Sequence, residues 1–467
     1  MIKVAIVGAG PAGIAAARVL AAHGVVPVMI DEGRRPGGQI FRQPRPDLRL
    51  DIEMLLGAEA ENYRRTHAAF GSLRDRIDYR PQTLAWGIED HTLHVTKGDA
   101  AATVAFDALI LATGATDRTV PVAGWTLPGV FTLGGAQVLL KEHGCLIGRR
   151  IVFCGSSPLL YLAAKQYRAM GAQIVAVLDT TPFAAKLTAA VDLAAAPGTL
   201  ARGLGYMAAL RGAGVAMHHG VTLRAFEGSR GVEAVRFHDR HGKEITLACD
   251  AVAVGFGLKP ETQLAELAGV PLDYDPVFRQ WLPRADVDGR CDGGIYLAGD
   301  GATAGGAQAA ALTGELAACA VLEDHKIAIA GVDRPRVRRQ VARLRRFQRG
   351  LARAFAWPVH AIQTLDDSVT VCRCEDISVG ELRASIRAEF GPSEVNRLKA
   401  ITRCGMGRCQ GRFCALAGAE LTAHELRVPV EAVGRLRAQP PVKPLPLSVT
   451  LAESAAAAAR DETSAPT

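Results

Sequence analysis

Residues 4–13 read Val-Ala-Ile-Val-Gly-Ala-Gly-Pro-Ala-Gly, a short apolar run that ends in a glycine-rich turn. This order is typical of a strand, a turn and a helix that together hold a nucleotide. Gly8 permits the tight turn, Gly10 lets the backbone approach a pyrophosphate, and Gly13 lets the helix lie close to the strand. The start of the helix offers unpaired N–H groups to the phosphate. We therefore expect a phosphate-binding turn at this position.

The sequence that follows the turn fits a nucleotide-binding unit. An alanine-rich helical pattern covers residues 14–23, and a second apolar run, residues 25–30, ends at Asp31 and Glu32. A GxGxxG turn alone is weak evidence, because a glycine turn in an unrelated α/β protein looks the same. The strand, helix and second strand supply the context that the motif requires. Asp31 is the expected ligand of a ribose hydroxyl.

Two later apolar runs lead into turns of the same kind. Residues 108–111 are followed by Thr113-Gly114, and residues 295–297 are followed by Gly299-Asp300 and by a helix that begins near Ala307-Gln308. Strands of a parallel sheet end in this way at the carboxyl edge, where ligands bind. We expect these turns to meet the first one at that edge.

A second strand, turn and helix begins at Ile151 with a damaged motif. The turn reads Gly155-Ser156-Ser157-Pro158-Leu159-Leu160, so only its first glycine remains. Ser157 stands where the backbone must approach a pyrophosphate, and Leu160 stands where the helix must approach the strand. We expect a second dinucleotide-binding fold that does not bind NAD(P)H tightly. A nucleotide held in another way and an empty structural domain both remain open.

The composition is that of an α/β enzyme. The chain has 467 residues, 49% hydrophobic and 22% charged, which is enough for two or three domains. Its net charge of +7 is concentrated in residues 334–353, and nothing in the sequence indicates nucleic-acid binding. No apolar stretch reaches the roughly 18 residues of a membrane span, and the strand pattern begins too early for a secretory leader. We therefore predict a cytoplasmic protein, with attachment to the inner membrane face as an alternative.

Residues 336–355 show apolar side chains at helical spacing with arginines between them. The apolar positions are Val337, Val341, Leu344, Phe347, Leu351 and Phe355. This pattern predicts an amphipathic helix that packs on its own domain. A basic face that meets a partner or an acidic membrane surface is the alternative.

Five of the ten cysteines lie between Cys372 and Cys414, as CxC followed by two overlapping CxxxxC pairs that share Cys409. Two thiolates from each group can bind the two irons of a [2Fe–2S] cluster. Zinc would accept the same ligands, and free thiols are the remaining alternative. Spacing alone does not choose four ligands from the five. The other cysteines are predicted to be small core residues: Cys145, Cys154, Cys249, Cys291 and Cys319.

The order of these motifs resembles the flavoproteins with two dinucleotide-binding domains, the glutathione and thioredoxin reductase superfamily, over residues 1–325. The resemblance implies an FAD site, with Asp300 on the ribityl chain and the helix end at Ala307 and Gln308 facing the flavin. The implied FAD contacts are Gly8, Gly10, Pro11, Ala12, Gly13, Asp31, Glu32, Gly38, Gln39, Thr113, Gly114, Gly299, Asp300, Ala307 and Gln308. The chain lacks the redox cysteine pair that disulfide reductases place beside the flavin, which argues against that activity.

The C-terminal cysteines resemble the [2Fe–2S] domain of the bacterioferritin-associated ferredoxin type. In the version with Gly-Met-Gly-Arg-Cys-Gln-Gly-Arg-Phe-Cys, the cysteine before this stretch is replaceable. The resemblance therefore implies Cys372, Cys374, Cys409 and Cys414 as the cluster ligands, with Cys404 in reserve.

The whole chain resembles the FAD-containing subunit of opine oxidases, hydrogen cyanide synthase and D-hydroxyproline or proline dehydrogenase complexes. In that family a partner that resembles D-amino acid oxidase oxidises the amine. The resemblance implies that this chain carries no catalytic acid or base and relays electrons to a quinone or dye acceptor. A small ferredoxin-like subunit is a further partner that it allows. Two alternatives stay open: a self-sufficient NAD(P)H-dependent flavin and iron–sulfur reductase, and a non-catalytic scaffold with structural zinc.

The predicted fold is α/β, with two Rossmann-like domains and a small helical C-terminal domain. The predicted boundaries are 1–117 with 257–330 for the FAD domain, 118–256 for the degenerate NAD(P)-binding-like domain, 331–365 for the basic linker helix, 366–428 for the [2Fe–2S] domain and 429–467 for a Pro-rich extended segment with a mobile tail.

Overall fold

The first sheet of the computed structural model, which describes residues 2–449, is parallel throughout. Its strand order is β20-β7-β1-β2-β3. The strands are β1 (Val4–Val7), β2 (Val28–Asp31), β3 (Asp78–Pro81), β7 (Ala108–Leu111) and β20 (Ile295–Leu297). All side chains of β1 and β7 are buried, as expected for apolar strands that are covered on both faces.

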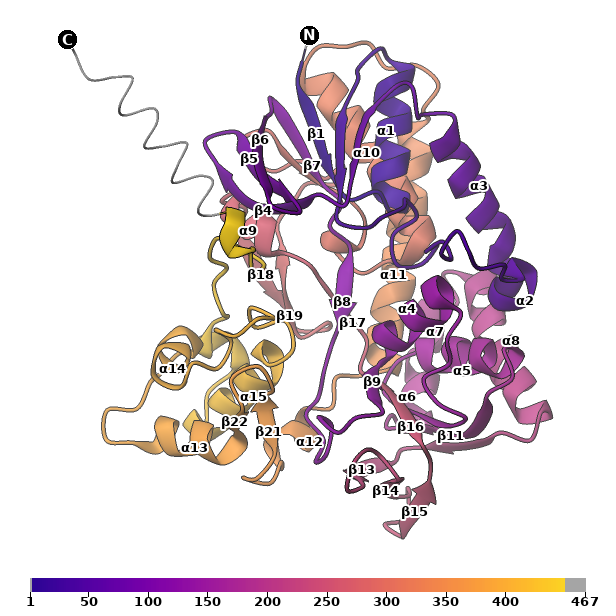
Figure 1. Cartoon of the computed structure of the whole chain (residues 1–467), viewed down its shortest axis with the longest axis vertical. Coiled ribbons are helices and arrows are strands. Elements are labelled where there is room, and N and C mark those ends of the chain that lie inside the picture. The colour runs from indigo at the N-terminus through magenta and orange to yellow at the C-terminus, as the bar shows by residue number, and fades with distance from the viewer. Residues whose placement is uncertain (1, 450–467) are drawn as a thin grey trace.

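Two helices lie side by side on one face of this sheet, α1 (Pro11–Ala22) and α10 (Gly306–Asp324) (Figure 1). A Cβ atom at Gly314 would lie 2.1 Å from the carbonyl oxygen of Ala12, so the two backbones touch and only glycine fits. Next to α1 is α3 (Ala60–Gly71). The other face is covered by an antiparallel sheet of β4 (Leu84–Glu89), β5 (Thr92–Lys97) and β6 (Ala100–Ala105).

The second parallel sheet has the order β12-β11-β10-β16-β9. Its strands are β9 (Val130–Thr132), β10 (Arg150–Gly155), β11 (Gln173–Asp179), β12 (Ala216–His219) and β16 (Ala251–Gly255). Its helices are α4 (Leu133–His143), α5 (Leu159–Ala169) and α8 (Pro197–Gly212), and a small antiparallel sheet adds β13 (Thr222–Glu227), β14 (Ala234–His238) and β15 (Glu244–Ala248). Two Rossmann-like sheets in one chain confirm the predicted fold class.

Two short antiparallel strands, β8 (Ala115–Asp117) and β17 (Leu258–Pro260), carry the chain between the two domains. β8 leaves the first sheet directly after β7, and β17 returns from β16. After β17 come α9 (Gln263–Leu267) and the hairpin of β18 (Leu272–Asp275) and β19 (Gln280–Pro283), and these lie on the side of the molecule that carries the C-terminal part.

The basic linker folds as one helix, α11 (Arg334–Ala354), which lies alongside α10 and the short helices α6 (Phe183–Thr188) and α7 (Ala190–Leu193). Four of the six predicted apolar positions are buried, namely Val337, Val341, Leu344 and Phe347. They contact Leu316 of α10 and Leu193 of α7 within two small apolar clusters. The helix therefore packs on its own chain, as the pattern predicts.

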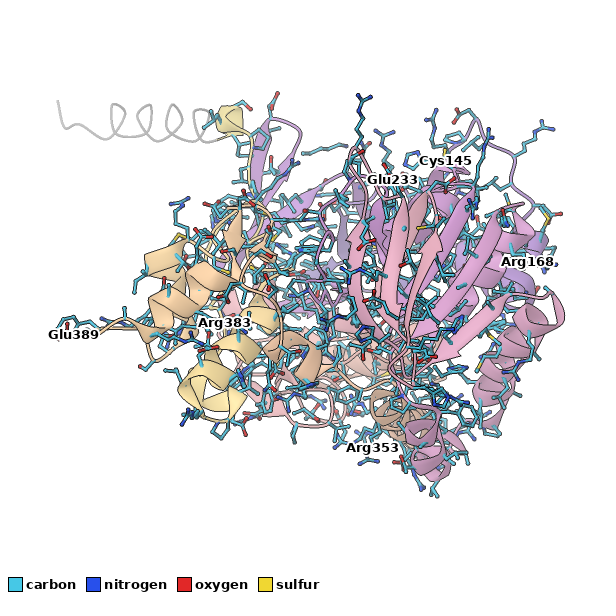
Figure 2. The ribbon with its side chains drawn as sticks, turned by 90° about the horizontal axis from the view of Figure 1, so that it is seen from below. Cys145, Arg168, Glu233, Arg353, Arg383 and Glu389 are labelled. Carbon is cyan, nitrogen blue, oxygen red and sulfur yellow. The ribbon has the colours of Figure 1, made fainter. Side chains whose placement is uncertain are left out.

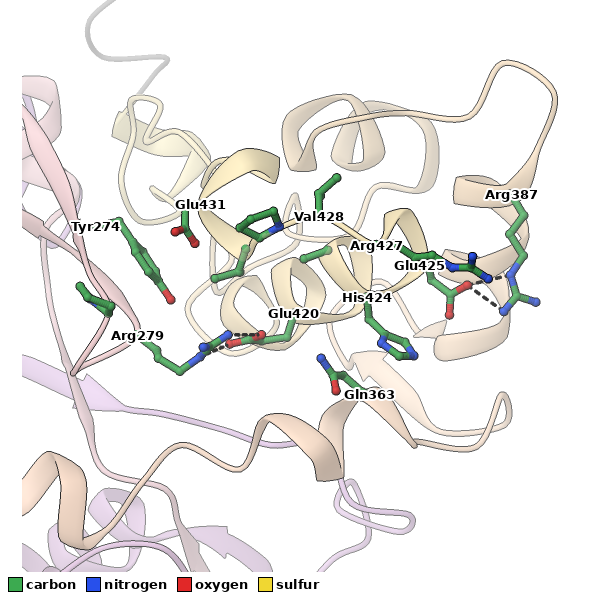
Figure 3. Close-up of a pocket in the computed structure, with 14 residues that line it drawn as sticks. Tyr274, Arg279, Gln363, Arg387, Glu420, His424, Glu425, Arg427, Val428 and Glu431 are labelled. Carbon is green, nitrogen blue, oxygen red and sulfur yellow. Dashed lines mark hydrogen bonds and ion pairs between the residues drawn. The ribbon is translucent and has the colours of Figure 1, made fainter. Parts of the chain in front are cut away.

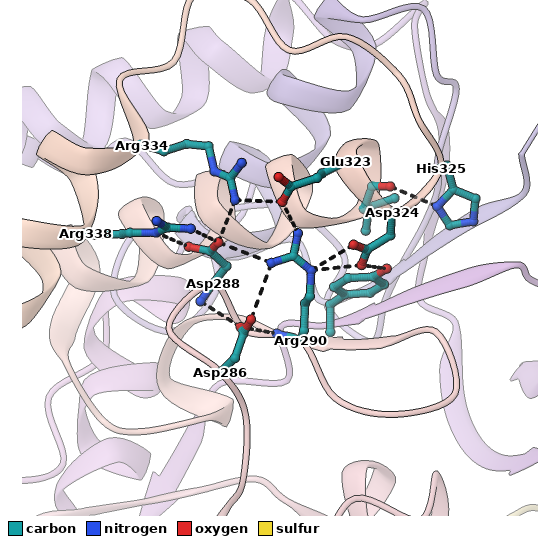
Figure 4. Close-up of polar contacts among 10 residues, drawn as sticks. Asp286, Asp288, Arg290, Glu323, Asp324, His325, Arg334 and Arg338 are labelled. Carbon is teal, nitrogen blue, oxygen red and sulfur yellow. Dashed lines mark hydrogen bonds and ion pairs between the residues drawn. The ribbon is translucent and has the colours of Figure 1, made fainter.

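A buried carboxylate, Asp288, fixes the start of α11 (Figure 4). Its Oδ2 accepts a hydrogen bond from Arg334 at 2.7 Å, and its Oδ1 accepts one from Arg338 Nε at 2.7 Å. Burial alone would raise the pKa of Asp288, but the hydrogen bonds and charges of Arg338 and Arg334 outweigh it and lower the pKa to about 2. Arg290 joins the same group through Glu323 and Asp324.

The C-terminal module is a compact unit of short elements (Figure 1). It contains α12 (Val359–Gln363), β21 (Thr370–Cys372), β22 (Ile377–Ser378), α13 (Val379–Arg387), α14 (Val395–Thr402) and α15 (Ala415–Leu426). Ser378 and Glu381 form the capping box that starts α13, each accepting a hydrogen bond from the other's backbone N–H. The predicted small helical domain is confirmed.

The proline-rich segment after the module returns to the first domain. The N–H of Val442 donates to the carbonyl oxygen of Trp86 at 3.0 Å, and Lys443 forms an ion pair with Glu32. The predicted mobile tail lies outside the described residues from Thr450 onward. Among the described residues, no helix combines the length and the apolar character needed to cross a membrane.

We predict that Asp288→Ala lowers the free energy of unfolding by about 3–5 kcal/mol, because it removes the buried carboxylate that Arg334 and Arg338 share. The matched control is Asp273→Ala, which breaks an exposed pair with Arg284 and should cost less than about 1 kcal/mol. Urea unfolding of both variants measures the difference. Equal losses would contradict the role of Asp288.

The lowered pKa of Asp288 also predicts that the stability of the protein decreases at acid pH. Its folded pKa of about 2 lies below the value of about 3.9 for an unfolded aspartate. Its contribution is therefore complete above pH ~4 and is lost as the pH falls toward 2. Thermal melts of wild type and Asp288→Ala should converge over this range.

Candidate functional site

Two glycine-rich loops close on each other at the carboxyl edge of the first sheet. Gly8 has a positive φ of 110°, and a Cβ atom there would lie 2.3 Å from the carbonyl oxygen of Ala112. A Cβ atom on Gly38 would lie 3.0 Å from the Cα of Gly10. The turn and the loop thus present bare backbone to the same space, as a pyrophosphate requires.

Asp31 ends β2 and closes this turn from the side. Its carboxylate accepts hydrogen bonds from the N–H groups of Ala9 and Gly33, the second at 2.6 Å. Burial raises the pKa of Asp31, and these two backbone hydrogen bonds oppose that rise. The neighbouring Glu32 instead reaches Lys443 in the proline-rich segment.

Asp300 lies on the same edge, after β20. Its Oδ1 accepts hydrogen bonds from the N–H groups of Gly305 at 2.8 Å and Gly306 at 3.0 Å, at the start of α10. Burial raises the pKa of Asp300, and the backbone hydrogen bonds from Gly305 and Gly306 oppose that rise. Within the described part of the chain its Oδ2 accepts no hydrogen bond. A partly buried carboxylate with a free oxygen fits a ligand hydroxyl, such as one of a ribityl chain.

The topology therefore brings the predicted nucleotide residues to one edge, since the turns follow parallel strands β1, β2, β7 and β20. Gln308 is exposed on the first turn of α10, and Ala307 is partly buried. The individual contacts of these residues with FAD stay a prediction. If FAD binds here, the backbone of Gly10 and Gly38 would meet its phosphates and Asp300 its hydroxyls.

The five C-terminal cysteines gather in two groups. The sulfur atoms of Cys372, Cys404 and Cys414 lie within 4.8 Å of one another, and all three residues are buried. Cys374 and Cys409 form a second pair, close enough for Cys409 to influence the pKa of Cys374. The predicted ligand set takes two residues from the first group and both from the second, and Cys404 lies in the first. The choice of four stays a prediction.

The charges in the first group suit a metal. The neighbouring thiols of Cys404 and Cys414 lower the pKa of Cys372, which favours its thiolate form. A Cβ atom on Gly407 would lie 2.4 Å from the Cβ of Cys374, so only glycine lets the two cysteine segments meet. The donor set fits an iron–sulfur cluster or zinc.

The remaining cysteines are dispersed. Cys154, Cys249 and Cys319 are buried, as predicted for small core residues, and Cys291 is partly buried. The prediction is wrong for Cys145, which is exposed after the left-handed Gly144 that ends α4. Figure 2 places Cys145 on the side of the second domain, away from Arg383 and Glu389 of the module.

Glu261 joins the expected flavin edge to the cysteine module. Its N–H donates to the carbonyl oxygen of Gly114 at 2.9 Å, and its own carbonyl oxygen accepts from Thr113 Oγ1 at 2.7 Å. Its carboxylate accepts two hydrogen bonds from Arg412, at 2.7 and 2.9 Å. Arg412 Nη1 in turn donates to the carbonyl oxygen of Cys409 at 3.2 Å. The cysteine turn is therefore held directly against the first domain.

The sequence reasoning missed Glu261. It follows a short strand and belongs to no motif, and its partner Arg412 comes far later in the chain. The motif Gly-Arg-Phe-Cys identifies the cysteine turn but does not predict which residue its arginine contacts.

In the second domain, side chains of the protein itself occupy the position where a nucleotide would bind. Asp179 ends β11, as Asp31 ends β2, but it is fully buried and accepts from Tyr161 OH at 2.6 Å. Lys186 Nζ lies 2.8 Å from the same carboxylate and 4.9 Å from the ring of Phe355, just after α11. The acid that would bind a ribose is thus already paired.

A cavity of about 910 Å³ lies between the module and the β18–β19 hairpin (Figure 3). Arg279 and Glu420 form a two-point ion pair across it, with hydrogen bonds of 2.9 and 2.8 Å. Arg387 and Glu425 pair on its other wall. None of the predicted nucleotide or cysteine residues lines this cavity.

Comparisons with known proteins agree with the two parts of the structure. The family model "Pyridine nucleotide-disulphide oxidoreductase" matches residues 2–321, and the model "Sarcosine oxidase A3 domain" matches residues 368–454. An opine oxidase subunit from Agrobacterium tumefaciens (strain Ach5) is 38% identical over 95% of this chain and 90% of its own length. Hydrogen cyanide synthase subunit HcnB of Pseudomonas aeruginosa is 31% identical over 95% of this chain and 97% of its own length.

A solved structure shows the same fold. L-proline dehydrogenase from P. horikoshii aligns with a TM-score of 0.71 at 20% identity, over 96% of this chain and 79% of the other.

We predict that serine at Cys372, Cys374, Cys409 or Cys414 removes most of the bound iron, because each loses a thiolate ligand. Serine at Cys404 should leave the iron content within about twofold of wild type. Iron analysis of the purified variants measures this, with Cys319→Ser as a buried cysteine far from the module. Loss of iron in Cys404→Ser, with retention in one of the four, would replace the predicted ligand set.

Proposed function

The chain belongs to the pyridine nucleotide-disulphide oxidoreductase family, in the group that includes hydrogen cyanide synthase subunit HcnB and its opine oxidase counterpart, and we propose that it is the electron-transfer subunit of an amine or imino acid dehydrogenase. The proposed cofactors are FAD in the first domain and a [2Fe–2S] cluster in the C-terminal module. FAD takes up two electrons and releases them singly, whereas the cluster carries one.

The observation that carries this proposal is the junction at Glu261. One residue is bonded to Thr113 and Gly114 on the expected flavin edge and, through its carboxylate, to Arg412 in the cysteine turn. A rigid contact of this kind keeps two redox sites at a constant separation without a domain movement. A zinc-binding scaffold would not need it.

The chain's own residues would position the cofactors and exclude water. The Gly10 and Gly38 backbones would hold the FAD phosphates, and Asp300 would accept a hydrogen bond from a ribityl hydroxyl. Arg412 and Glu261 are only 12% and 16% exposed, so little water enters the junction. None of these groups is placed as an acid or base for amine oxidation.

We therefore assign the oxidation of the amine to a partner that resembles D-amino acid oxidase. The names of the relatives support this division, since the opine oxidase, hydrogen cyanide synthase and sarcosine oxidase relatives are each one subunit of a larger enzyme. The proposed substrates are D-hydroxyproline, proline or an opine, and the proposed acceptor is a quinone or a dye. Among the described residues the cysteines form no disulfide bonds, which suits a reducing compartment. The proposed location is the cytoplasm, either free or attached to the inner face of the membrane.

We predict that the purified protein is reduced only slowly by NADH or NADPH. Asp179 is paired with Tyr161 and Lys186, and Ser157 lies where a glycine would admit the pyrophosphate. Anaerobic mixing followed by flavin absorbance measures this, with dithionite as the control reductant. Bleaching within seconds would favour the self-sufficient NAD(P)H reductase.

We also predict that co-expression with its genomic neighbours brings down an oxidase-like subunit. The purified complex should reduce a dye with an imino acid or opine, and this chain alone should not. The signal of a reduced [2Fe–2S] cluster in electron paramagnetic resonance should appear when substrate is added. Zinc without iron in the purified chain would refute the electron-transfer proposal.

A further inference from the structure

The two short helices that follow β11 expose an apolar surface. Phe183 and Leu187 of α6 and Val191 of α7 have exposed fractions of 54%, 65% and 72%. They are four residues apart, and residues at this spacing lie on one side of a helical segment. None of the exposed residues within 182–198 carries a charge. A helix whose outer side meets only water normally presents charged and polar residues there.

The two charged side chains of this segment turn away from the apolar surface. Lys186 Nζ lies 2.8 Å from the buried carboxylate of Asp179. Asp192 points to α11, where its carboxylate accepts a hydrogen bond from Arg346 Nε at 3.0 Å and forms an ion pair with Arg353. Both arginine side chains stay about half exposed. The apolar surface is therefore bordered by two partly exposed arginines.

Three further arginines lie on the same face of α11. Arg336, Arg339 and Arg343 are exposed, and their spacing of three and four residues places them on one side of the helix. In the part of the chain that the structure describes, their guanidinium groups have no acidic partner. These three groups are therefore free to bind an external anion.

The apolar segment and the arginines form one continuous surface. A Cβ atom on Gly350 would lie 2.9 Å from the Cβ of Asp192, so α7 rests on the arginine face of α11. Arg343 lies about two helical turns before Gly350 on that face. Residues 334–365 contain no Asp or Glu, and Asp192 is the only acidic residue within 180–226. The surface thus combines exposed apolar side chains with positive charge that the chain does not neutralise.

We propose that this surface attaches the chain to an anionic lipid bilayer. Phe183, Leu187 and Val191 enter the boundary between headgroups and acyl chains, and the arginines of α11 bind lipid phosphates. Guanidinium groups suit this role because they bind phosphate through two parallel hydrogen bonds. A second copy of the chain fits this surface less well, because a twofold interface would bring the arginines of both copies together.

This inference rests on the function proposed above and gives the electron acceptor a location. A quinone is dissolved in the bilayer, so electrons must leave the protein at the lipid surface. The side of α11 opposite its arginines meets the expected flavin edge, where Gln348 Nε2 donates to the carbonyl oxygen of Gly305 at 3.0 Å. The N–H of Gly305 in turn donates to Asp300. One helix, about 10 Å across, therefore separates the lipid surface from the expected flavin site.

The test measures sedimentation of the full chain with lipid vesicles, in complex with its partner subunit where the two associate. One set of vesicles is phosphatidylcholine mixed with phosphatidylglycerol, and the other is phosphatidylcholine alone. Each set is used at low and at high salt, because salt screens the attraction between arginines and lipid phosphates. Circular dichroism and flavin content establish that each variant is folded and loaded.

Two variants remove the two components of the surface. A triple variant, Arg336→Gln with Arg339→Gln and Arg343→Gln, removes the free charges, and a double variant, Leu187→Gln with Val191→Gln, removes apolar contacts. The matched charge control removes three exposed cations from the β13–β15 sheet and its turns: Arg224→Gln, Arg230→Gln and Lys243→Gln. The matched apolar control is Phe390→Gln, on the exposed tip of the C-terminal module.

We expect the wild type to sediment with the anionic vesicles, to be released at high salt and to stay in solution with phosphatidylcholine alone. The triple arginine variant should lose about tenfold or more in affinity, since each basic residue at an anionic surface contributes roughly fivefold. The double apolar variant should also bind more weakly, because it buries less apolar surface in the bilayer. Both controls should stay within about twofold of wild type.

Wild-type protein that does not sediment with anionic vesicles overturns the inference. So does an equal loss in the triple variant and its charge control, because net charge and not this surface would then be responsible. A partner subunit that blocks vesicle binding and is released by the triple arginine variant also overturns it, because the surface would then be a protein interface. Failure of the proposed function is separate, since wild-type protein without iron refutes electron transfer whatever its binding to vesicles.

Discussion

The two-point ion pair between Glu261 and Arg412 is the contact on which the proposed redox geometry depends. Parallel N–H···O bonds from a guanidinium set both distance and orientation, which a single hydrogen bond does not. Because the backbone of Glu261 is bonded to Thr113 and Gly114, the pair transmits the position of the first sheet to the cysteine turn. The apolar residues of the module are continuous with the core of the second domain, and Trp125 Nε1 donates to the carbonyl oxygen of Thr370 at 2.6 Å. The Glu261–Arg412 pair is the contact that ties this packed module to the flavin edge.

Much of the fold could be predicted because its signals are local. Gly8 and Gly13 mark the first nucleotide turn for reasons that act within the turn, since Gly8 has a positive φ of 110° and a Cβ atom on Gly13 would lie 1.9 Å from the carbonyl oxygen of Gly8. The same holds for the capping box at Ser378 and for the apolar stripe of the linker helix, of which four positions are buried. Apolar residues that repeat every two positions in a strand, or every three to four positions in a helix, indicate which face of the element is buried.

What could not be predicted depends on contacts between distant parts of the chain. Asp288 belongs to no sequence motif, yet it anchors two arginines of α11, the nearer of them 46 residues further along the chain. The five cysteines were recognised as a group, but spacing does not show that Cys404 joins Cys372 and Cys414 while Cys374 faces Cys409. An apolar context predicts a core position for Cys145, but the preceding Gly144 ends α4 and Cys145 is exposed. Sequence patterns carry no signal for tertiary pairing of this kind.

The sequence of the first domain is interrupted by the second domain, so the ribosome finishes the second domain's strands before those of the first. All strands of the second sheet lie in one continuous stretch, from Val130 to Gly255, so that sheet can form before the rest of the chain is synthesised. The first domain must wait, because β20 and α10 are synthesised afterwards and α1 lacks the neighbour that lies across Ala12 and Gly314. Domains fold as units in the order of synthesis. We therefore expect the sheet of the inserted domain to form before the sheet of the domain that surrounds it, and the apolar face of α1 to stay uncovered until α10 has been synthesised as far as Asp324.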